Sequence, residues 1–488
     1  MLITGKWKQE RFHDERMMTA VRYLLFGTGD YYERYKKWFH KSQVLALLDN
    51  ASSKQHTYID DIQVVSPESG VQLSYDVIVI LSFYVKAMKR QLMDLGVPKE
   101  KIYHFYDLHK LIRCRQFQWP VQYYGDGEKI VNGTERSSRK ILLLSHDLNL
   151  GGPALALYHM AKALKKQEFD VVFGSMIDGP LRDKLVEEQI PVVIDYALQI
   201  GTMEEIRWIS SFSFIICNTI NFHVFLSKRD TKISVLWWLH DSEFFYEGVD
   251  KELLRGLDLK HMEIAAVGPV PQKAINKFLP DIPVRNLLYG VSDETNVCDT
   301  EWGKGRDLPI CFVTIGYIEE RKGQDILIQA IKLLAEEVRQ KAVFYLSGQD
   351  TSLMALRIKE EIERLPQIVI TGTLDRIGIN RIISRSDVMI CPSREDPMPT
   401  VAAEAMMHRV PCIVSDATGT SAYLQDHVNG MIFRSQDARD LSERIAWCVE
   451  HREELQKMGV MARRIYEDHF SMEAFETNFH KILDKAVE

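Results

Sequence analysis

The chain has 488 residues, of which 46% are hydrophobic and 26% are charged. This is an ordinary globular composition with enough apolar material for several cores, and the length corresponds to about three domains. The formal net charge of −7 argues against nucleic acid as the main partner, because a phosphate backbone is bound by a basic surface.

Cysteine use and the terminal sequence set the expected compartment. The seven cysteines are scattered and form no C-x-x-C pair, which favours buried free thiols in a reducing environment. Residues 1–16 are polar and contain no apolar signal segment, and no window of the sequence reaches the roughly 18 apolar residues that span a bilayer. We therefore expect a cytoplasmic protein with at most peripheral contact with the inner face of the membrane.

Short apolar runs alternate with longer amphipathic runs along most of the chain, which is typical of βαβ units and parallel sheets. The first block covers residues 1–120, with strands expected over Tyr23–Phe26, Val44–Leu48 and Asp76–Leu81 and a helix over Val85–Leu95. A glycine turn follows the first strand but lacks the third glycine of a dinucleotide site. We expect a small Rossmann-like domain with a docking or assembly role.

The next segment, residues 121–139, is polar and without periodicity, and we interpret it as a linker. The second block covers residues 140–303, with a helix over Ala154–Lys165 and strands over Ile141–Leu144, Val171–Phe173, Val192–Ile194, Phe214–Cys217, Ser234–Leu239 and Ile264–Val267.

The third block covers residues 304–470. It contains an expected helix over Asp325–Arg339 and strands over Ile310–Ile315, Val343–Leu346, Ile368–Ile370, Val388–Cys391 and Cys412–Val414. Residues 471–488 are amphipathic, and we expect them to form a C-terminal helix that packs back on the second block.

The most informative segment is C-P-S-R-E-D-P-M-P-T-V-A-A-E-A-M-M, residues 391–407. Its prolines hold the chain out of a helix until Thr400, which we expect to cap a helix that carries Glu404. Asp396 and Glu404 then flank a helix N-terminus, where free amides suit a phosphate and carboxylates suit sugar hydroxyls. A nucleotide-sugar needs this combination, although ordinary capping and surface acids explain the two carboxylates equally well.

A second segment, I-G-Y-I-E-E-R-K-G-Q-D, covers residues 315–325. Gly316 ends a strand, and Arg321 and Lys322 open the next helical region. Cations at the carboxyl end of a parallel strand lie in the crevice where α/β proteins bind ligands, and they can neutralise a diphosphate leaving group. A solvated run of charges is the alternative interpretation.

Two weaker signals lie in the second block. Gly151 and Gly152 follow its first strand and let the backbone approach a ligand closely, although a structural turn explains them as well. His240 follows the Ser234–Leu239 strand, from where a histidine can face an inter-domain cleft. A structural histidine with satisfied hydrogen bonds is the alternative.

Together these segments resemble the family 4 glycosyltransferases, and the resemblance covers the chain from about residue 140 to its end. P-S-R-E-D-P-M-P-T-V-A-A-E-A-M resembles the family's E-x7-E signature, with Asp396 and Glu404 at its acidic positions. L-G-G-P-A-L-A-L is similar to the family's glycine loop, and W-W-L-H-D places His240 at its cleft histidine. Y-G-V-S-D-E, residues 289–294, is similar to the segment that enters the inter-domain linker.

The resemblance implies an α/β protein of the GT-B fold. Two facing Rossmann-like domains would enclose an inter-domain cleft, with the acceptor side in residues 140–303 and the nucleotide-sugar donor side in residues 304–470. The first block resembles Rossmann-like modules attached to sugar-modifying enzymes of bacterial surface-polysaccharide pathways, and it would form a third, smaller domain.

The resemblance also implies roles for individual residues. Glu404 would bind the ribose hydroxyls, while Arg321 and Lys322 would face the diphosphate. Asp396 would hold the transferred sugar, and His240 would contact that sugar near the reacting carbon. The other residues expected to line the donor site are Gly151, Gly152, Gly316, Pro397, Met398, Pro399, Thr400 and Val401.

Three features depart from the family pattern. The first acid, Asp396, is one methylene shorter than the usual glutamate and has Glu395 beside it. Tyr317 stands where the family often has arginine. Thr418 and Gly419 stand where the family usually has two glycines.

The implied activity is a retaining transfer of a sugar from a nucleotide-sugar, with UDP as the expected nucleotide, in bacterial surface polysaccharide or glycoconjugate synthesis. The acceptor would be a glycan, a protein or a lipid-linked glycan. No D-x-D motif flanks a strand end in the donor half, so neither a metal nor another cofactor is expected. We expect a front-face substitution, because no carboxylate in these motifs is placed as a covalent nucleophile.

Two other functions remain as alternatives. A catalytically silent GT-B subunit, acting in assembly through residues 1–120, is a different class on the same fold. A GT-B epimerase or phosphorylase is disfavoured by the Asp396 and Glu404 signature and by the lack of a context for a Schiff-base lysine.

Overall fold

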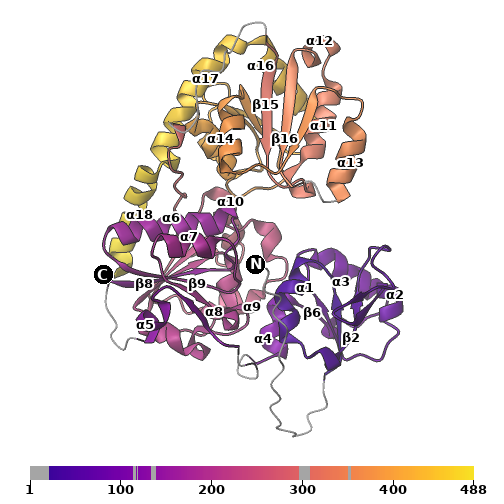
Figure 1. The fold of residues 1–488 in the computed structure, drawn as a ribbon, viewed down its shortest axis with the longest axis vertical. Helices are drawn as coiled ribbons and strands as arrows, with labels where there is room; N and C mark the ends of the chain where they lie inside the picture. The colour runs from indigo at the N-terminus through magenta and orange to yellow at the C-terminus, as the bar shows by residue number, and fades with distance from the viewer. Residues whose placement is uncertain are drawn as a thin grey trace. The chain divides into compact units, whose positions relative to one another are not determined.

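The computed structural model describes residues 21–113, 117, 119–132, 139–295, 308–349 and 353–487. The chain divides into two compact units, Met1–Ile112 and Arg113–Glu488. Among the described residues there are three sheets, one in the first unit and two in the second (Figure 1), and most of their strand pairs are parallel. This is the expected α/β architecture.

The first unit has one sheet in the order β3-β4-β2-β1-β5-β6, in which only β3 runs antiparallel to its neighbour. Its strands are β1 (Tyr23–Phe26), β2 (Val44–Leu48), β3 (Tyr58–Ile59), β4 (Ile62–Val65), β5 (Val77–Ile80) and β6 (Ile102–His104). The helices between them are α1 (Asp30–Tyr35), α2 (Pro67–Gly70), α3 (Val85–Asp94) and α4 (Leu108–Leu111). Gly27 has a positive φ of 111°, and a Cβ there would lie 2.7 Å from the Leu81 carbonyl oxygen. The backbone conformation and the packing of this turn are therefore enough to require glycine.

The second sheet has the order β14-β13-β12-β11-β8-β9-β10-β7. Its strands are β7 (Gln122–Tyr124), β8 (Lys140–Ser145), β9 (Asp170–Ser175), β10 (Val192–Ile194), β11 (Phe214–Asn218), β12 (Ser234–Leu239), β13 (Met262–Ala266) and β14 (Val284–Asn286). The helices are α5 (Gly127–Asn132), α6 (Gly152–Lys166), α7 (Leu181–Glu187), α8 (His223–Leu226), α9 (Lys251–Arg255) and α10 (Pro269–Asn276). The central strands are buried on both faces, which is why they read as continuous apolar runs.

The interpretation of residues 121–139 as a linker is wrong for most of their described part. Gln122–Tyr124 forms β7, which pairs antiparallel with β10 at the edge of the second sheet, and α5 follows directly. An edge strand is only half buried, so β7 carries no apolar run that would reveal it. Residues 133–138 lie outside the described part of the chain, as does the expected domain boundary at residues 303 and 304.

The third sheet has the order β17-β16-β15-β18-β19-β20. Its strands are β15 (Ile310–Ile315), β16 (Ala342–Ser347), β17 (Ile368–Gly372), β18 (Val388–Cys391), β19 (Cys412–Ser415) and β20 (Met431–Phe433). The helices are α11 (Gln324–Leu333), α12 (Glu336–Arg339), α13 (Leu353–Ile362), α14 (Arg376–Ser384), α15 (Thr400–Met407), α16 (Ala438–Glu450), α17 (Arg452–Ile465) and α18 (Met472–Val487). The single helix expected over residues 325–339 is two helices, because Leu334 and Ala335 have extended backbone angles.

The C-terminal helix α18 packs on the second sheet. The ring of Phe475 stacks on that of Trp238 in β12 at 5.9 Å, and the Gln167 and His480 side chains are hydrogen-bonded at 2.7 Å. Just before α18, Ser471 bridges to Val291, whose carbonyl oxygen accepts a hydrogen bond from the Tyr466 hydroxyl at 2.8 Å. The end of the chain therefore returns from the third sheet to the second.

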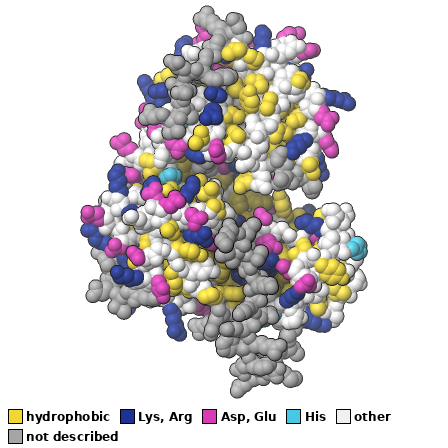
Figure 2. All heavy atoms as spheres, viewed as in Figure 1, with side chains coloured by type: hydrophobic (Ala, Val, Ile, Leu, Met, Phe, Trp, Pro, Cys, Tyr) yellow, Lys and Arg dark blue, Asp and Glu magenta, His cyan; other side chains and the backbone are white. Residues whose placement is uncertain are grey.

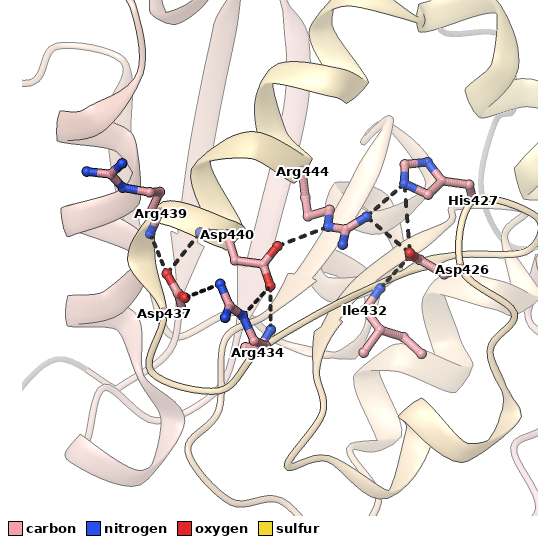
Figure 3. Close-up of polar contacts among 8 residues, drawn as sticks. All are labelled: Asp426, His427, Ile432, Arg434, Asp437, Arg439, Asp440 and Arg444. Carbon is pink, nitrogen blue, oxygen red and sulfur yellow. Dashed lines mark hydrogen bonds and ion pairs between the residues drawn. The ribbon is translucent and has the colours of Figure 1, made fainter.

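The edge strand β20 is tied to α16 by a network of charges (Figure 3). Arg444 on α16 donates to Asp426 at 3.1 Å and to Asp440 at 3.3 Å. Arg434, just after β20, pairs with Asp437 at 2.7 Å, and its backbone N–H donates to Asp440 at 2.8 Å. These contacts fix an edge strand that has a sheet neighbour on one side only.

The described cysteines are all free thiols: Cys217, Cys311, Cys391, Cys412 and Cys448. Cys114 and Cys298 lie outside the described residues. In the part of the chain that the structure describes, none of the helices has the length and apolar character needed to cross a bilayer. On the face drawn in Figure 2, acidic and basic side chains are interspersed rather than segregated.

Candidate functional site

The centre of the candidate site is the turn between β18 and α15. The chain leaves β18 at Cys391, runs through a proline-rich turn and enters α15 at Thr400. The N-cap is Pro399, with extended backbone angles, and Thr400 is the first helical residue, so the expected capping role of Thr400 is wrong. Pro399 fixes its own φ and so sets the start of the helix one residue earlier than a threonine cap would.

Asp396 lies in this turn and is 5% exposed. Lys322 reaches it with Nζ 2.6 Å from Oδ2, and Arg321 lies farther away, with Nη1 at 4.0 Å. The backbone of Asp396 bridges to Thr418, and its carbonyl accepts a hydrogen bond from Gly419 at 2.9 Å. A Cβ on Gly419 would lie 1.9 Å from the Pro397 carbonyl oxygen, so glycine is required at the second position of this turn.

The loop after β15 delivers Lys322 to Asp396. Lys322 ends a short 3-10 helix, and the next residue, Gly323, has a φ of 69° and packs against the carbonyl of Pro392. The Lys322 chain passes over Gly316, where a Cβ would lie 3.7 Å from Cε of the lysine. This is an ordinary contact distance, so it is the positive φ of Gly316, 148°, rather than the passage of the lysine, that favours glycine here.

Arg321 has other partners than Lys322. Its guanidinium donates to the Glu319 carboxylate at 2.8 Å and to the Glu395 carbonyl oxygen at 3.2 Å. Glu395 thus meets the cationic loop through its backbone, while Asp396 meets it through its carboxylate. Tyr317, which follows Gly316 at the end of β15, is 63% exposed.

A small pocket lies between the two loops and is lined by Lys322, Gln324, Asp396, Pro399 and Val401, among others. Gln324 is 2% exposed, and its Nε2 donates to the Tyr317 carbonyl at 2.8 Å. Its Oε1 is buried and has no hydrogen-bond partner among the described residues. Gln324 therefore joins the candidate site, and its place two residues after Lys322 in the same motif is the signal that the sequence offered.

Glu404 lies in the second turn of α15 and is 7% exposed. Its Oε1 lies 2.5 Å from Nη1 of Arg376, the first residue of α14, and Nε of the same arginine lies 2.8 Å from Glu294. Arg376 was not singled out in the sequence, because it stands in an ordinary polar helix start after its N-cap Asp375. Each acid of the pair thus has a cationic partner.

The residues Pro397 to Val401 divide between turn and core. Met398 is 6% exposed and its methyl group packs where a Cβ of Gly268 would lie, so its side chain belongs to the hydrophobic core. Only the backbone of Met398 is available to a ligand. In the first turn of α15, the Ala402 amide donates to the Pro399 carbonyl at 3.1 Å, while the amides of Thr400 and Val401 come before the first hydrogen bond within the helix.

The glycine loop of the second sheet approaches this helix start. Gly151 is the N-cap of α6 and Gly152 its first residue. A Cβ on Gly152 would lie 3.8 Å from Cγ2 of Thr400. The glycine loop and the start of α15, expected on opposite sides of one site, therefore lie next to each other.

His240 follows β12 and is 7% exposed, with its ring edge-on to that of Trp238 at 4.5 Å. Burial, reinforced by His146, lowers the pKa of His240 to about 3, so the ring is neutral at physiological pH. Its Nε2 has no hydrogen-bond partner among the described residues. A buried ring nitrogen of this kind is a candidate for contact with a ligand.

A further polar residue lies on the neighbouring strand. Asn218 ends β11, is fully buried and donates from Nδ2 to the Pro153 carbonyl of α6 at 2.6 Å. Its Oδ1 has no partner in the described part of the chain. The next residue, Thr219, has a φ of 75°, which is strained for a β-branched side chain. Strain of this kind is found where a turn is held for function, and it leaves no signal in the sequence.

The fold class follows from solved structures. HepE of Anabaena in complex with UDP superposes with a TM-score of 0.60 at 18% sequence identity, covering 71% of this chain and 100% of that one. The lipopolysaccharide outer core galactosyltransferase WaaB in its apo form gives a TM-score of 0.58 at 15% identity, covering 71% and 99%. The second unit therefore has the GT-B fold, preceded by an additional N-terminal domain, which confirms the expected fold class.

Family models divide the chain in the same way. Residues 304–465 match the family described as Glycosyl transferases group 1, and residues 19–103 match C2185-like, N-terminal. The first of these matches contains the Lys322, Asp396, Arg376 and Glu404 constellation.

Curated relatives match over shorter stretches. Alpha-D-kanosaminyltransferase of Streptomyces kanamyceticus is 26% identical over 195 residues, which is 36% of this chain and 48% of the relative. D-inositol 3-phosphate glycosyltransferase of Xylanimonas cellulosilytica is 27% identical over 202 residues, 39% and 43% of the two chains. The chain thus matches somewhat less than half of the length of these relatives.

Proposed function

We propose that this chain is a family 4, retaining glycosyltransferase that moves a sugar from a nucleotide-sugar to an acceptor hydroxyl. A UDP-sugar is the expected donor, and a glycan, a protein or a lipid-linked glycan of bacterial surface polysaccharide or glycoconjugate synthesis is the expected acceptor. One observation carries the proposal: two buried acids, Asp396 and Glu404, lie on either side of the start of α15, each beside a cation. They lie within the segment that matches the group 1 glycosyltransferases.

The proposed binding roles follow from charge and position. Glu404 accepts hydrogen bonds from the ribose hydroxyls, and the first-turn amides of α15 meet the phosphates. Lys322 and Arg321 neutralise the diphosphate as it leaves, and Asp396 binds hydroxyls of the transferred sugar. Gln324 Oε1, buried in the same pocket, is an additional acceptor for a donor hydroxyl.

The proposed chemistry is a front-face substitution. The bond between the anomeric carbon and the phosphate oxygen breaks, and its electron pair stays on the diphosphate. The acceptor oxygen bonds to the anomeric carbon from the same face, and its proton passes to the departing phosphate oxygen. His240, neutral because it is buried, contributes a hydrogen bond to the sugar rather than a proton. The protein then supplies charge stabilisation and orientation.

Lys322 and Arg321 would carry the charge that a metal ion carries in other transferases, and we propose a metal-independent reaction on that ground. Donor hydrolysis tests the proposal. The full-length chain is incubated with UDP-glucose, UDP-galactose, UDP-N-acetylglucosamine and GDP-mannose, with and without EDTA, and the released nucleoside diphosphate is measured.

Release from a UDP-sugar that survives EDTA supports the proposal, and the anomeric configuration of the freed sugar, read by proton NMR, tests retention. If no nucleoside diphosphate is released from any of these donors and UDP does not raise the unfolding temperature, the result would instead support the silent GT-B subunit. Release abolished by EDTA and restored by Mg²⁺ would contradict metal independence.

A further inference from the structure

Arg376 lies between two acids that come from different parts of the second unit. Its Nη1 is 2.5 Å from Oε1 of Glu404 on α15, and its Nε is 2.8 Å from Oε2 of Glu294. One guanidinium thus makes charge-assisted hydrogen bonds in two directions. Such bonds have fixed geometry because the guanidinium is planar.

The two ends of this bridge differ in exposure. The Glu404 side chain is 10% exposed, whereas the side chains of Glu294 and Arg376 are 29% and 44% exposed. Burial alone would lower the pKa of Arg376, but the Glu404 and Glu294 carboxylates outweigh it and raise that pKa. The arginine therefore stays charged, and it is the cation that compensates the buried Glu404.

Glu294 is itself held in place. Its carboxylate also accepts from Asn380 Nδ2 on α14, and its backbone N–H lies 3.3 Å from the sulfur of Met407 at the end of α15. Three residues earlier, Val291 bridges to Ser471 before α18. Glu294 therefore lies on the segment that leaves the second sheet for the third, and it fixes Arg376 from that side.

We infer that Arg376 is a positioning residue for nucleotide recognition and that Glu294 sets its position. Arg376 occupies one oxygen of Glu404, places a positive charge beside that carboxylate and fixes its plane. A carboxylate has lone pairs for about four hydrogen bonds, so a fixed one still accepts from ribose hydroxyls. This inference rests on the proposed function, because it gives Glu404 the ribose.

The bridge makes recognition of the ribose depend on a residue that does not touch it. If Glu294 is lost, Arg376 loses one of its two anchors and Glu404 loses its fixed orientation. The discrimination in favour of ribose then weakens, although Glu404 is unchanged. A purely structural role of the bridge would alter stability without altering this discrimination.

The experiment measures the affinities of the full-length chain for UDP and for 2′-deoxy-UDP by calorimetry. The wild-type chain is expected to bind UDP about tenfold more tightly, the value of one hydrogen bond to a charged group. Glu294→Gln and Arg376→Gln are each expected to reduce this ratio to about twofold. Arg376→Lys keeps the positive charge but cannot bond to both carboxylates as the guanidinium does, so we expect its affinity ratio to fall to about twofold as well.

Asp293→Asn is the matched control. Asp293 is the neighbouring acid, but its partner is Arg463, at 2.5 Å, so the variant removes one negative charge beside Glu294 and should keep the tenfold ratio. The unfolding temperature of each variant shows that it is folded. If one of the Gln variants does not fold, the other still tests the inference, because Glu294→Gln removes one anchor of the guanidinium and Arg376→Gln removes the guanidinium itself.

The outcomes separate the two claims. Full discrimination in Glu294→Gln and Arg376→Gln, together with its loss in Glu404→Gln, overturns the role of the bridge and leaves the proposed function standing. Full discrimination in Glu404→Gln overturns the ribose role on which both depend. A wild-type chain that binds neither nucleotide contradicts both claims, and an equal loss in Asp293→Asn overturns the inference in favour of a general charge effect.

Discussion

Lys322 Nζ lies 2.6 Å from Asp396 Oδ2, so the cation proposed for the diphosphate and the first acid of the pair neutralise each other beside the start of α15. Both side chains are mostly buried, at 20% and 7% exposure. A buried carboxylate needs such a partner, because an uncompensated charge is costly away from water. The contact shows how the shorter Asp396 is held within reach of the cationic loop.

This pair predicts a stability effect that is separable from activity. Lys322→Met removes the nearer cation of Asp396 and leaves only Arg321, at 4.0 Å, so it should lower the free energy of unfolding by about 2 kcal/mol, less than the roughly 3–5 kcal/mol of a fully uncompensated buried charge. The double variant Lys322→Met with Asp396→Asn removes the stranded charge and should recover most of that loss, because two neutral groups need no ion pair. Urea unfolding of the wild type, both single variants and the double variant measures the coupling. Strictly additive effects would mean that the pair does not interact.

Asp241 predicts a decline in stability with rising pH. It is 6% exposed and accepts a hydrogen bond from the backbone N–H of Ile220 at 2.7 Å, and burial raises its pKa from 3.8 to about 7. Between these values the folded chain holds a proton that the unfolded chain has lost, so raising the pH favours unfolding. The contribution is about 4 kcal/mol at most between pH 4 and pH 7.

The check is Asp241→Asn, which keeps an acceptor for Ile220 and removes the titration. Urea unfolding at pH 5, 6, 7 and 8 should show a smaller decline in the variant than in the wild type. A decline of the same size in both chains would exclude Asp241 as its source.

His240 predicts an effect on rate without an effect on pH dependence. Because burial and His146 hold the pKa of His240 near 3, the ring is neutral throughout the range from pH 5 to pH 8. His240→Gln should lower kcat by about tenfold, the value of one hydrogen bond, and leave the shape of the profile unchanged. The measurement is kcat against pH for both chains. A limb of the profile that disappears in the variant would show that His240 titrates during the reaction.

The division into two units predicts where the chain can be cut. Removing residues 1–112 leaves the second unit with all eight strands of its first sheet, so nucleotide binding and a cooperative unfolding transition should persist. Cutting after residue 125 removes the edge strand β7 and leaves β10 as the exposed edge of the sheet, which should lower the unfolding temperature by several degrees. Calorimetric scans with and without UDP compare the two truncations. Loss of UDP binding in the chain that lacks only residues 1–112 would mean that part of the nucleotide site lies in the first unit.

The sequence predicted the long strands because of how parallel sheets are buried. Ser234–Leu239 and Ile310–Ile315 are continuous apolar runs, and each is a strand over those residues. β20, with three residues, was not predicted, although β10, which is equally short, was. β7 is half buried at a sheet edge, so it reads as polar linker.

The candidate site was predicted where its residues share a motif and missed where they do not. Asp396 and Glu404 lie eight positions apart around one helix start, and Arg321 and Lys322 are adjacent. The pairing of Lys322 with Asp396 spans 74 positions and that of Arg376 with Glu404 spans 28. Contacts of this kind depend on how loops from different strands meet, which no local spacing rule describes.

The most direct test of the account is donor turnover by the wild type, Glu404→Gln and Lys322→Met, measured as released nucleoside diphosphate with the donor that the wild type hydrolyses. Asp293→Asn serves as a folded control with a changed surface charge. Both site variants should lose at least about a hundredfold in kcat/KM, because each removes a charged contact to the donor. Near wild-type turnover in both variants would contradict the claim that Asp396, Glu404 and Lys322 form a donor site.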